Sequence, residues 1–123
     1  MNRAYISTRF IRRYQNNAGR YTPELRLGYR INDTFSTYFD QTIDRWQVVH
    51  NTTGRAVIDT KTRKQAVIAA YAFLPYDMNQ IVTINESNGH IEWTNDESKQ
   101  HSIDTYRTLK NLFTLPDSLY IPE

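Results

Sequence analysis

Arginine is concentrated in the first thirty residues of the chain. This segment holds seven arginines and one acidic residue, Glu24, whereas residues 31–123 hold eight lysines and arginines against twelve aspartates and glutamates. The formal net charge of +2 therefore conceals a strongly basic beginning and an acidic remainder. Because the planar guanidinium group suits phosphates, carboxylates and aromatic faces, a cluster of arginine without lysine indicates a contact surface. The alternative is that these charges balance the acidic part of the same molecule.

Tyrosine and phenylalanine are interleaved with these arginines, a combination typical of nucleic-acid-binding surfaces. Arginine neutralises phosphates and reads guanine edges, and aromatic rings stack on unpaired bases. The same residue types are enriched in the hot spots of protein–protein interfaces, so an acidic protein surface is the second expected partner. No signature of an RRM, KH, helix-turn-helix or zinc-finger domain accompanies the pattern. The residues expected to contact nucleic acid or a protein partner are Arg9, Arg12, Arg13, Tyr14, Arg20, Arg26 and Arg30.

Catalytic chemistry has weaker support in the sequence. The three histidines, His50, His90 and His101, occur in no metal-binding spacing. Absence of cysteine excludes disulfides and thiolate catalysis. His50 and His90 stand at expected strand–turn junctions, which predicts exposed or rim positions. A metal-free ribonuclease would need a general acid, a general base and a phosphate-binding cation, and these residue types are present without a clustered motif. We expect no catalytic site, metal or cofactor.

Length and composition predict one small domain over residues 1–123. The chain has no run of eighteen apolar residues and no apolar segment of a secretory signal near its beginning. These features predict a cytoplasmic protein that does not enter a membrane. The oligomeric state stays open.

Two strands must position the arginines, in an N-terminal hairpin over about residues 4–31. Residues 4–15 are rich in aromatic and β-branched side chains, and residues 24–31 alternate between apolar and polar positions. In the second strand the side chains expected to face inward are Leu25, Leu27, Tyr29 and Ile31. Those expected to face outward are Glu24, Arg26, Gly28 and Arg30.

The clearest local pattern is a strand–strand–helix unit over residues 46–75. A strand begins at Trp46, a turn ends at Gly54, and a second strand follows. Thr62 stands three residues before Gln65, which is the spacing of a capping box and predicts a helix over about 63–74. The side chains of this unit that we expect in the core are Trp46, Ala66, Ala70 and Phe73.

The rest of the chain completes an α+β fold. Residues 34–44 fit a strand or a short helix, and their aromatic and threonine content favours the strand. Residues 80–113 predict a hairpin followed by a second helix over about 97–113, with an apolar stripe that includes Tyr106 and Leu109. Residues 114–123 are expected to form an extended tail that packs on the domain. We therefore expect a mainly antiparallel sheet of about five to seven strands with two helices.

The layout of residues 46–66, Trp46-x-Val48 followed by Thr53-Gly54, Val57 and Thr62-x-x-x-Ala66, is similar to that of many short bacterial and phage strand–strand–helix domains. The small size and the uneven charge resemble accessory proteins of phages and plasmids, including inhibitors of host nucleases such as anti-CRISPR proteins. This resemblance implies a non-enzymatic binding protein that engages nucleic acid or a nucleic-acid-processing complex through its basic hairpin. The alternatives are an inhibitor that binds protein alone and a small metal-free ribonuclease.

Overall fold

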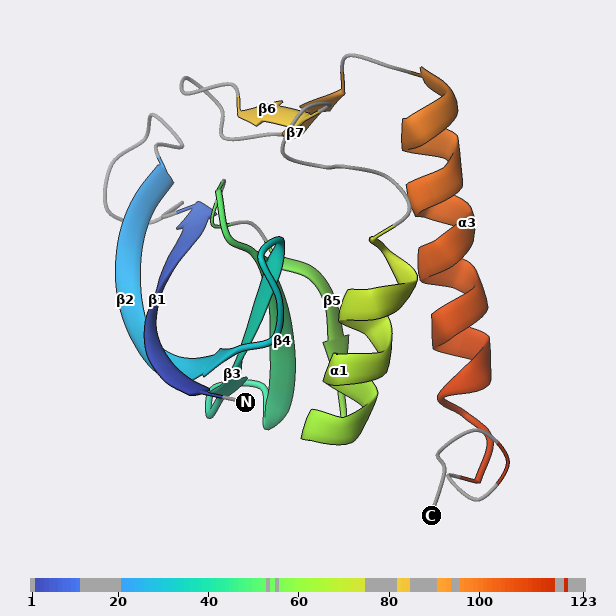
Figure 1. Cartoon of the computed structure of the whole chain (residues 1–123), viewed down its shortest axis with the longest axis horizontal. Helices are drawn as coiled ribbons and strands as arrows, with labels where there is room; N and C mark the ends of the chain where they lie inside the picture. The colour runs from blue at the N-terminus through green and yellow to red at the C-terminus, as the bar shows by residue number, and fades with distance from the viewer. Residues whose placement is uncertain are drawn as a thin grey trace.

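The fold is known from a computed structural model of the chain, whose described residues confirm an α+β architecture with a five-stranded antiparallel sheet, a separate two-stranded antiparallel sheet and two helices (Figure 1). The residues that the structure describes are 2–11, 21–52, 54, 56–74, 82–84, 91–93, 96–116 and 119. The strands of the large sheet are β1 (Asn2–Ile11), β2 (Tyr21–Arg30), β3 (Phe35–Asp40), β4 (Arg45–His50) and β5 (Ala56–Thr60). The other elements are β6 (Val82–Ile84), β7 (Ile91–Trp93), α1 (Arg63–Ala72) and α3 (Asp96–Leu112).

Each strand of the large sheet pairs with its neighbour in sequence, in the order β1-β2-β3-β4-β5. The strands β1 and β2 pair over ten positions, whereas β2 and β3 pair at two, Tyr29 with Thr37 and Arg30 with Ser36. The segment 34–44, which fits two patterns in the sequence, contains β3 and then a turn over 41–44, so the preference for a strand is confirmed. Gly54 has a φ of 73°, as the expected turn requires.

The expected capping box begins α1, with one difference. The Gln65 backbone N–H donates to Thr62 Oγ1 at 3.2 Å. The Gln65 side chain accepts a hydrogen bond from the backbone N–H of Lys61 at 3.1 Å, one residue before the position that a standard capping box uses. Both bonds satisfy backbone donors near the start of the helix, which explains why α1 begins where the sequence predicts.

The core lies between α1 and the strands β3 to β5. Ala66, Ala69 and Ala70 of α1 and Phe73 at its C-terminal cap are buried against Phe35, Val48 and Ile58. Leu109 and Phe113 close the cluster from the side of α3. The expected core positions on α1 are therefore confirmed. Trp46 is only half-buried, because it lies at the edge of this cluster, and Tyr106 is exposed instead of joining the apolar stripe of α3.

Three expectations about the fold have partial answers. In the described part of the tail, Leu115 and Leu119 are exposed, whereas residues 117, 118 and 120–123 lie outside the described residues. The expected turns at 16–19 and 86–89 also lie outside them. No helix among the described residues is both long and apolar enough to cross a membrane.

Candidate binding surface on the β1–β2 hairpin

The β1–β2 hairpin leaves the rest of the sheet soon after its base. Because β2 pairs with β3 only at Tyr29 and Arg30, the residues from Tyr21 to Gly28 pair with β1 and with no other described strand. In Figure 1 the two strands curve together at the left of the view, whereas α1 and α3 lie at the right. Over these residues the hairpin is therefore a two-stranded ribbon, joined to the described part of the sheet at its base.

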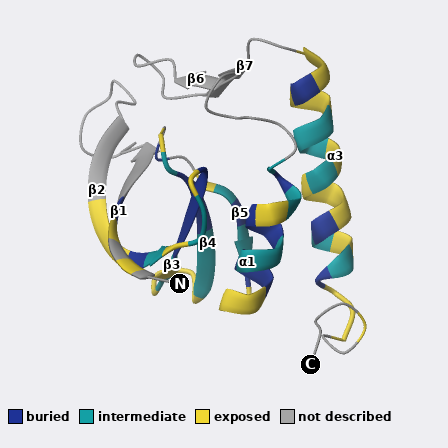
Figure 2. Cartoon of the chain, in the orientation of Figure 1, coloured by how far each residue is buried: buried dark blue, intermediate teal, exposed yellow. Residues whose placement is uncertain are grey.

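One face of this ribbon carries an exposed apolar cluster, which we call the Tyr5–Leu27 patch and define by Tyr5, Leu25 and Leu27. These side chains are 76%, 67% and 49% exposed. Tyr5 pairs directly with Leu27 across the two strands, and Leu25 is on the same face two residues away (Figure 2 shows the exposed part of β2). The expectation that Leu25 and Leu27 face inward to a core was therefore wrong.

Helix α1 explains the exposure of the patch. The patch is on the face of the sheet that α1 covers at β3, β4 and β5, because Tyr29 of the same face pairs with Thr37, and Thr37 with Val48 of the core. A helix about 10 Å wide covers roughly two or three strands that are about 4.8 Å apart. Among the described residues, α1 consequently leaves the Tyr5–Leu27 patch of β1 and β2 without cover.

The opposite face of the ribbon is closed at its base. Ile6 and Gly28 are buried, although Gly28 was expected to face outward. A β-carbon placed on Gly28 would lie 2.5 Å from Ile6 Cδ1 and 2.9 Å from Tyr38 Cβ, and it would also overlap the Thr37 carbonyl oxygen. The missing side chain therefore lets β1 and β3 approach each other at the point where the hairpin joins the sheet.

Cations and aromatic rings meet at the base of the hairpin. The Arg63 guanidinium group of α1 lies 4.6 Å from the centre of the Tyr29 ring, within the range of a cation–π interaction. The Tyr29 and Trp46 ring centres are 6.3 Å apart, and Phe39 meets Trp46 edge-on at 5.6 Å. Exposed Arg3 pairs with Tyr29 across the strands. The patch thus adjoins a row of rings bordered by two arginines.

The structure places two of the residues expected to bind a partner on one face of β2. Arg26 and Arg30 are exposed and are on the face of β2 opposite to the Tyr5–Leu27 patch. Arg26 lines a pocket of about 230 Å³ with residues 39–42. Arg30 donates to Asp33 at 3.1 Å, and both side chains are largely exposed, so the pair contributes little to stability.

The structure does not describe the side chains of the other expected contact residues. The backbone of Arg9 pairs with Pro23 in the hairpin. Arg12, Arg13, Tyr14 and Arg20 lie outside the described residues.

Arg3, Tyr5 and Arg63 were not among the expected contact residues. Arg3 and Tyr5 share the period-two pattern of β1 with Arg9, and this pattern could have included them. Nothing local in the sequence relates Arg63 to Tyr29, because the contact joins a helix and a strand that are distant in the chain.

The two described histidines, His50 and His101, belong to separate elements, β4 and α3. His50 is fully buried and packs its ring 6.0 Å from that of Phe35, so the expected rim position was wrong. The end of β4 faces the core here because His50 pairs with Phe35 on the side that α1 covers. His101 is half-buried on α3, and His90 lies outside the described residues. Among the described residues, no three histidine, aspartate or glutamate side chains form a group that could hold a metal ion.

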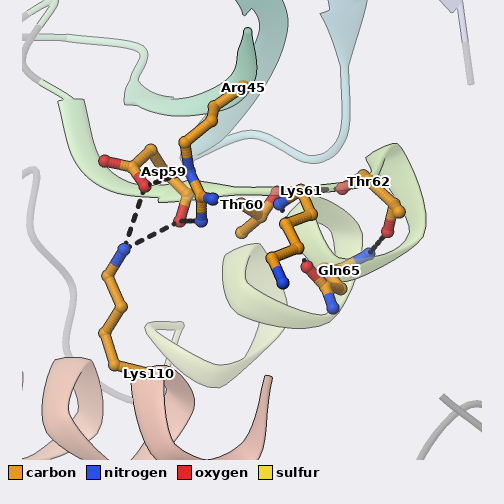
Figure 3. A network of polar contacts seen from close by, with 7 residues as sticks. All are labelled: Arg45, Asp59, Thr60, Lys61, Thr62, Gln65 and Lys110. Atoms are coloured by element: carbon orange, nitrogen blue, oxygen red, sulfur yellow. Dashed lines mark hydrogen bonds and ion pairs between the residues drawn. The ribbon is translucent and has the colours of Figure 1, made fainter. Parts of the chain in front are cut away.

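A polar cluster near the β5 edge of the sheet, opposite to the edge formed by β1, joins β4, β5 and α3 (Figure 3). Asp59 Oδ1 accepts hydrogen bonds from Arg45 Nε at 2.6 Å and from Lys110 Nζ at 2.9 Å. Partial burial raises the pKa of Asp59, but the hydrogen bonds and charges of Lys110 and Arg45 outweigh it and hold the pKa below its ordinary value. The contact fixes α3 to the edge of the sheet.

We predict that Asp59→Asn lowers the free energy of unfolding by about 1 kcal/mol near neutral pH, because each lost ion pair is about one third exposed. A lowered pKa stabilises the folded state above the unfolded-state pKa of about 3.9, and this contribution is lost as the pH falls through the folded-state pKa. The difference between Asp59→Asn and the natural chain should therefore disappear in acid. Urea unfolding from neutral to acidic pH measures it, and a difference independent of pH would contradict this role.

Comparison of the chain with protein-family models, characterised sequences and solved structures finds no match.

Proposed function

We propose that this chain is a non-enzymatic binding protein whose β1–β2 hairpin engages nucleic acid or a complex that processes nucleic acid. The observation that carries the proposal is the exposure of Tyr5, Leu25 and Leu27 on a ribbon that also bears arginines. Contiguous patches of exposed apolar side chains often mark interaction sites. The phage-like inhibitors that the chain resembles in size and charge are one class of such proteins.

Charge supports a negatively charged partner. Seven of the fifteen lysines and arginines stand in the first thirty residues with a single acidic residue. Arg3 adds a cation on the face of the Tyr5–Leu27 patch, and Arg26 adds one on the opposite face. A partner that bears phosphates or carboxylates would therefore meet a favourable field on both faces of the ribbon.

The row of aromatic rings at the base of the hairpin supports nucleic acid itself as the partner. Tyr29 and Trp46 are half-buried, Phe39 is exposed, and aromatic rings of this kind stack on unpaired bases. Arg3 and Arg63 lie beside the rings and would neutralise phosphates.

A protein partner is the second candidate, favoured by the leucines of the patch. Leu25 and Leu27 offer no hydrogen bond and no ring to a base, whereas an aliphatic pair next to Tyr5 suits the centre of a protein interface. On this alternative the chain binds an acidic protein surface and has no affinity for nucleic acid alone.

Buried His50 supports a function without catalysis. A general acid or base must reach the proton that it transfers, and His50 has no exposed surface. We predict that His101→Ala, which changes a half-buried histidine, leaves binding unchanged in the folded protein. Turnover of an RNA substrate by the natural chain, lost in His101→Ala with unchanged melting, would instead indicate a ribonuclease.

Partner capture from a cell lysate, with and without nuclease treatment, separates the two candidates. Nucleic-acid binding predicts that capture depends on intact nucleic acid and that a purified oligonucleotide binds. If Arg26 contacts a phosphate, Arg26→Ala should lower the salt slope of that binding by about one, while Lys99→Ala on exposed α3 should leave it unchanged. Capture that survives nuclease, with no oligonucleotide binding, would favour the protein partner.

A further inference from the structure

A second cationic feature lies away from the hairpin, where β4, the start of α1 and the end of α3 meet. A pocket of about 250 Å³ is lined by Arg45, Lys61, Gln65, Lys110, Phe113 and Thr114. Pockets that hold drug-sized ligands begin at about 300 Å³, so this one suits a smaller molecule or a single functional group. The proposed binding function of the hairpin makes no use of it.

The pocket carries an excess of positive charge. Arg45, Lys61 and Lys110 line it, and Asp59 neutralises one of their three charges through its contacts with Arg45 and Lys110. These contacts also hold the two side chains in place, since both donate to the same Asp59 oxygen. Lys61 is exposed, and in Figure 3 its side chain extends between those of Gln65 and Lys110.

The start of α1 gives a second, independent indication. Lys61, Arg63 and Lys64 surround the N-terminal end of the helix, and its first turn contains no acidic residue. The N-terminal end of a helix carries a partial positive charge, so basic residues there are unfavourable for the helix itself. A bound anion would remove this unfavourable interaction, and helix N-termini are good anion sites.

We propose that this pocket binds a phosphate group. The excess of two positive charges matches a phosphate monoester, which carries about −1.5 to −2 near neutral pH, better than a single carboxylate. Arg45 and Lys110 line the pocket and are held by the side chain and carbonyl oxygen of Asp59, so they would offer the anion the donors that Asp59 leaves unused, and Lys61 contributes its charge from the rim. The phosphate belongs either to a small metabolite or to the end of a nucleic-acid strand.

Inorganic phosphate is the probe that tests this site, by the rise in Tm and by calorimetry against sodium chloride at equal ionic strength. Phosphate should raise the Tm of the natural chain, and Lys61→Ala should weaken phosphate binding about tenfold, a loss equivalent to about 1.4 kcal/mol. Lys99→Ala is the matched control, because Lys99 is also an exposed lysine but belongs to α3, away from the start of α1, and does not line the pocket. It should change the affinity less than twofold.

The absence of a phosphate effect beyond that of chloride would overturn the proposal, and so would equal losses in Lys61→Ala and Lys99→Ala. A 5′-phosphorylated oligonucleotide and its unphosphorylated counterpart then distinguish the source. A Lys61-dependent preference for the phosphorylated strand assigns the site to a nucleic-acid end, and phosphate binding without that preference assigns it to a metabolite. The hairpin substitutions are not involved, so this test can fail or succeed independently of the proposed function.

Discussion

Phe73→Ala should lower the free energy of unfolding by about 3–5 kcal/mol, the range found when a buried aromatic side chain is truncated. Phe73 is 3% exposed, and its ring lies 6.1 Å from that of Phe35 at the centre of the core. Removing it leaves a cavity that rigid neighbours on β3 cannot fill. Urea unfolding followed by tryptophan fluorescence measures the change.

Tyr71→Ala is the control for this prediction. Tyr71 is an aromatic residue of the same helix but is exposed, so its truncation should cost less than about 1 kcal/mol. A loss below that value in Phe73→Ala, or equal losses in the two variants, would show that α1 presents another face to the sheet.

Gly28→Val should lower the free energy of unfolding by about 2–3 kcal/mol, in the upper part of the range for an overfilled interior. The new β-carbon would meet the Thr37 carbonyl oxygen, which belongs to the backbone and cannot rotate away as a side chain could. The pairing of β2 with β3 would have to shift, and this pairing joins the hairpin to the sheet. Chemical denaturation measures the stability, and amide hydrogen exchange of Tyr29 and Arg30 reports on the junction.

Leu27→Val serves as the control for Gly28→Val. It introduces the same β-branched side chain one position earlier in β2, on the exposed face, and should change stability by less than about 0.5 kcal/mol. Unchanged stability in Gly28→Val would mean that the hairpin joins the sheet less closely than the contacts around Gly28 indicate.

Local sequence patterns predicted the central unit well because each signal there acts over a few residues. The Thr62–Gln65 pair satisfies backbone donors within one turn, so its effect is independent of the rest of the fold. Gly54 likewise meets a local need for a positive φ. The aromatic and threonine content of residues 34–44 also favoured a strand where the spacing fitted both a strand and a helix, and the first residues of that strand are buried on both faces.

Whether a given face of a strand lies against the core or in solvent could not be predicted in the same way. Alternation along β2 correctly separates Leu25 and Leu27 from Arg26, but it does not reveal which strands the single core helix covers. Gly28 and His50 are both buried through contacts with β3. The pattern of residues around either position does not identify this neighbouring strand.

The charge of the N-terminal residues indicated the hairpin as the candidate site, and the exposure of its side chains changed which residues belong to that site. The concentration of arginine pointed to the hairpin, and Arg26 and Arg30 are exposed there. Arg30 forms an ion pair with Asp33, which no pattern in the sequence indicated. The Tyr5–Leu27 patch was missed because leucines in an alternating strand are expected to be buried.

The most direct test of the central claim is partner capture by a chain in which the hairpin surface is changed and the core is kept. The substitutions Leu25→Ser, Leu27→Ser and Arg3→Glu alter three exposed side chains, so the melting temperature should stay close to that of the natural chain. The control carries Tyr71→Ser and Lys99→Glu, which alter exposed side chains on the helices. If the hairpin is the binding surface, the first variant should bind at least about tenfold more weakly, as for the loss of interface hot spots, and the control should bind normally. Normal binding by the folded hairpin variant would contradict the claim.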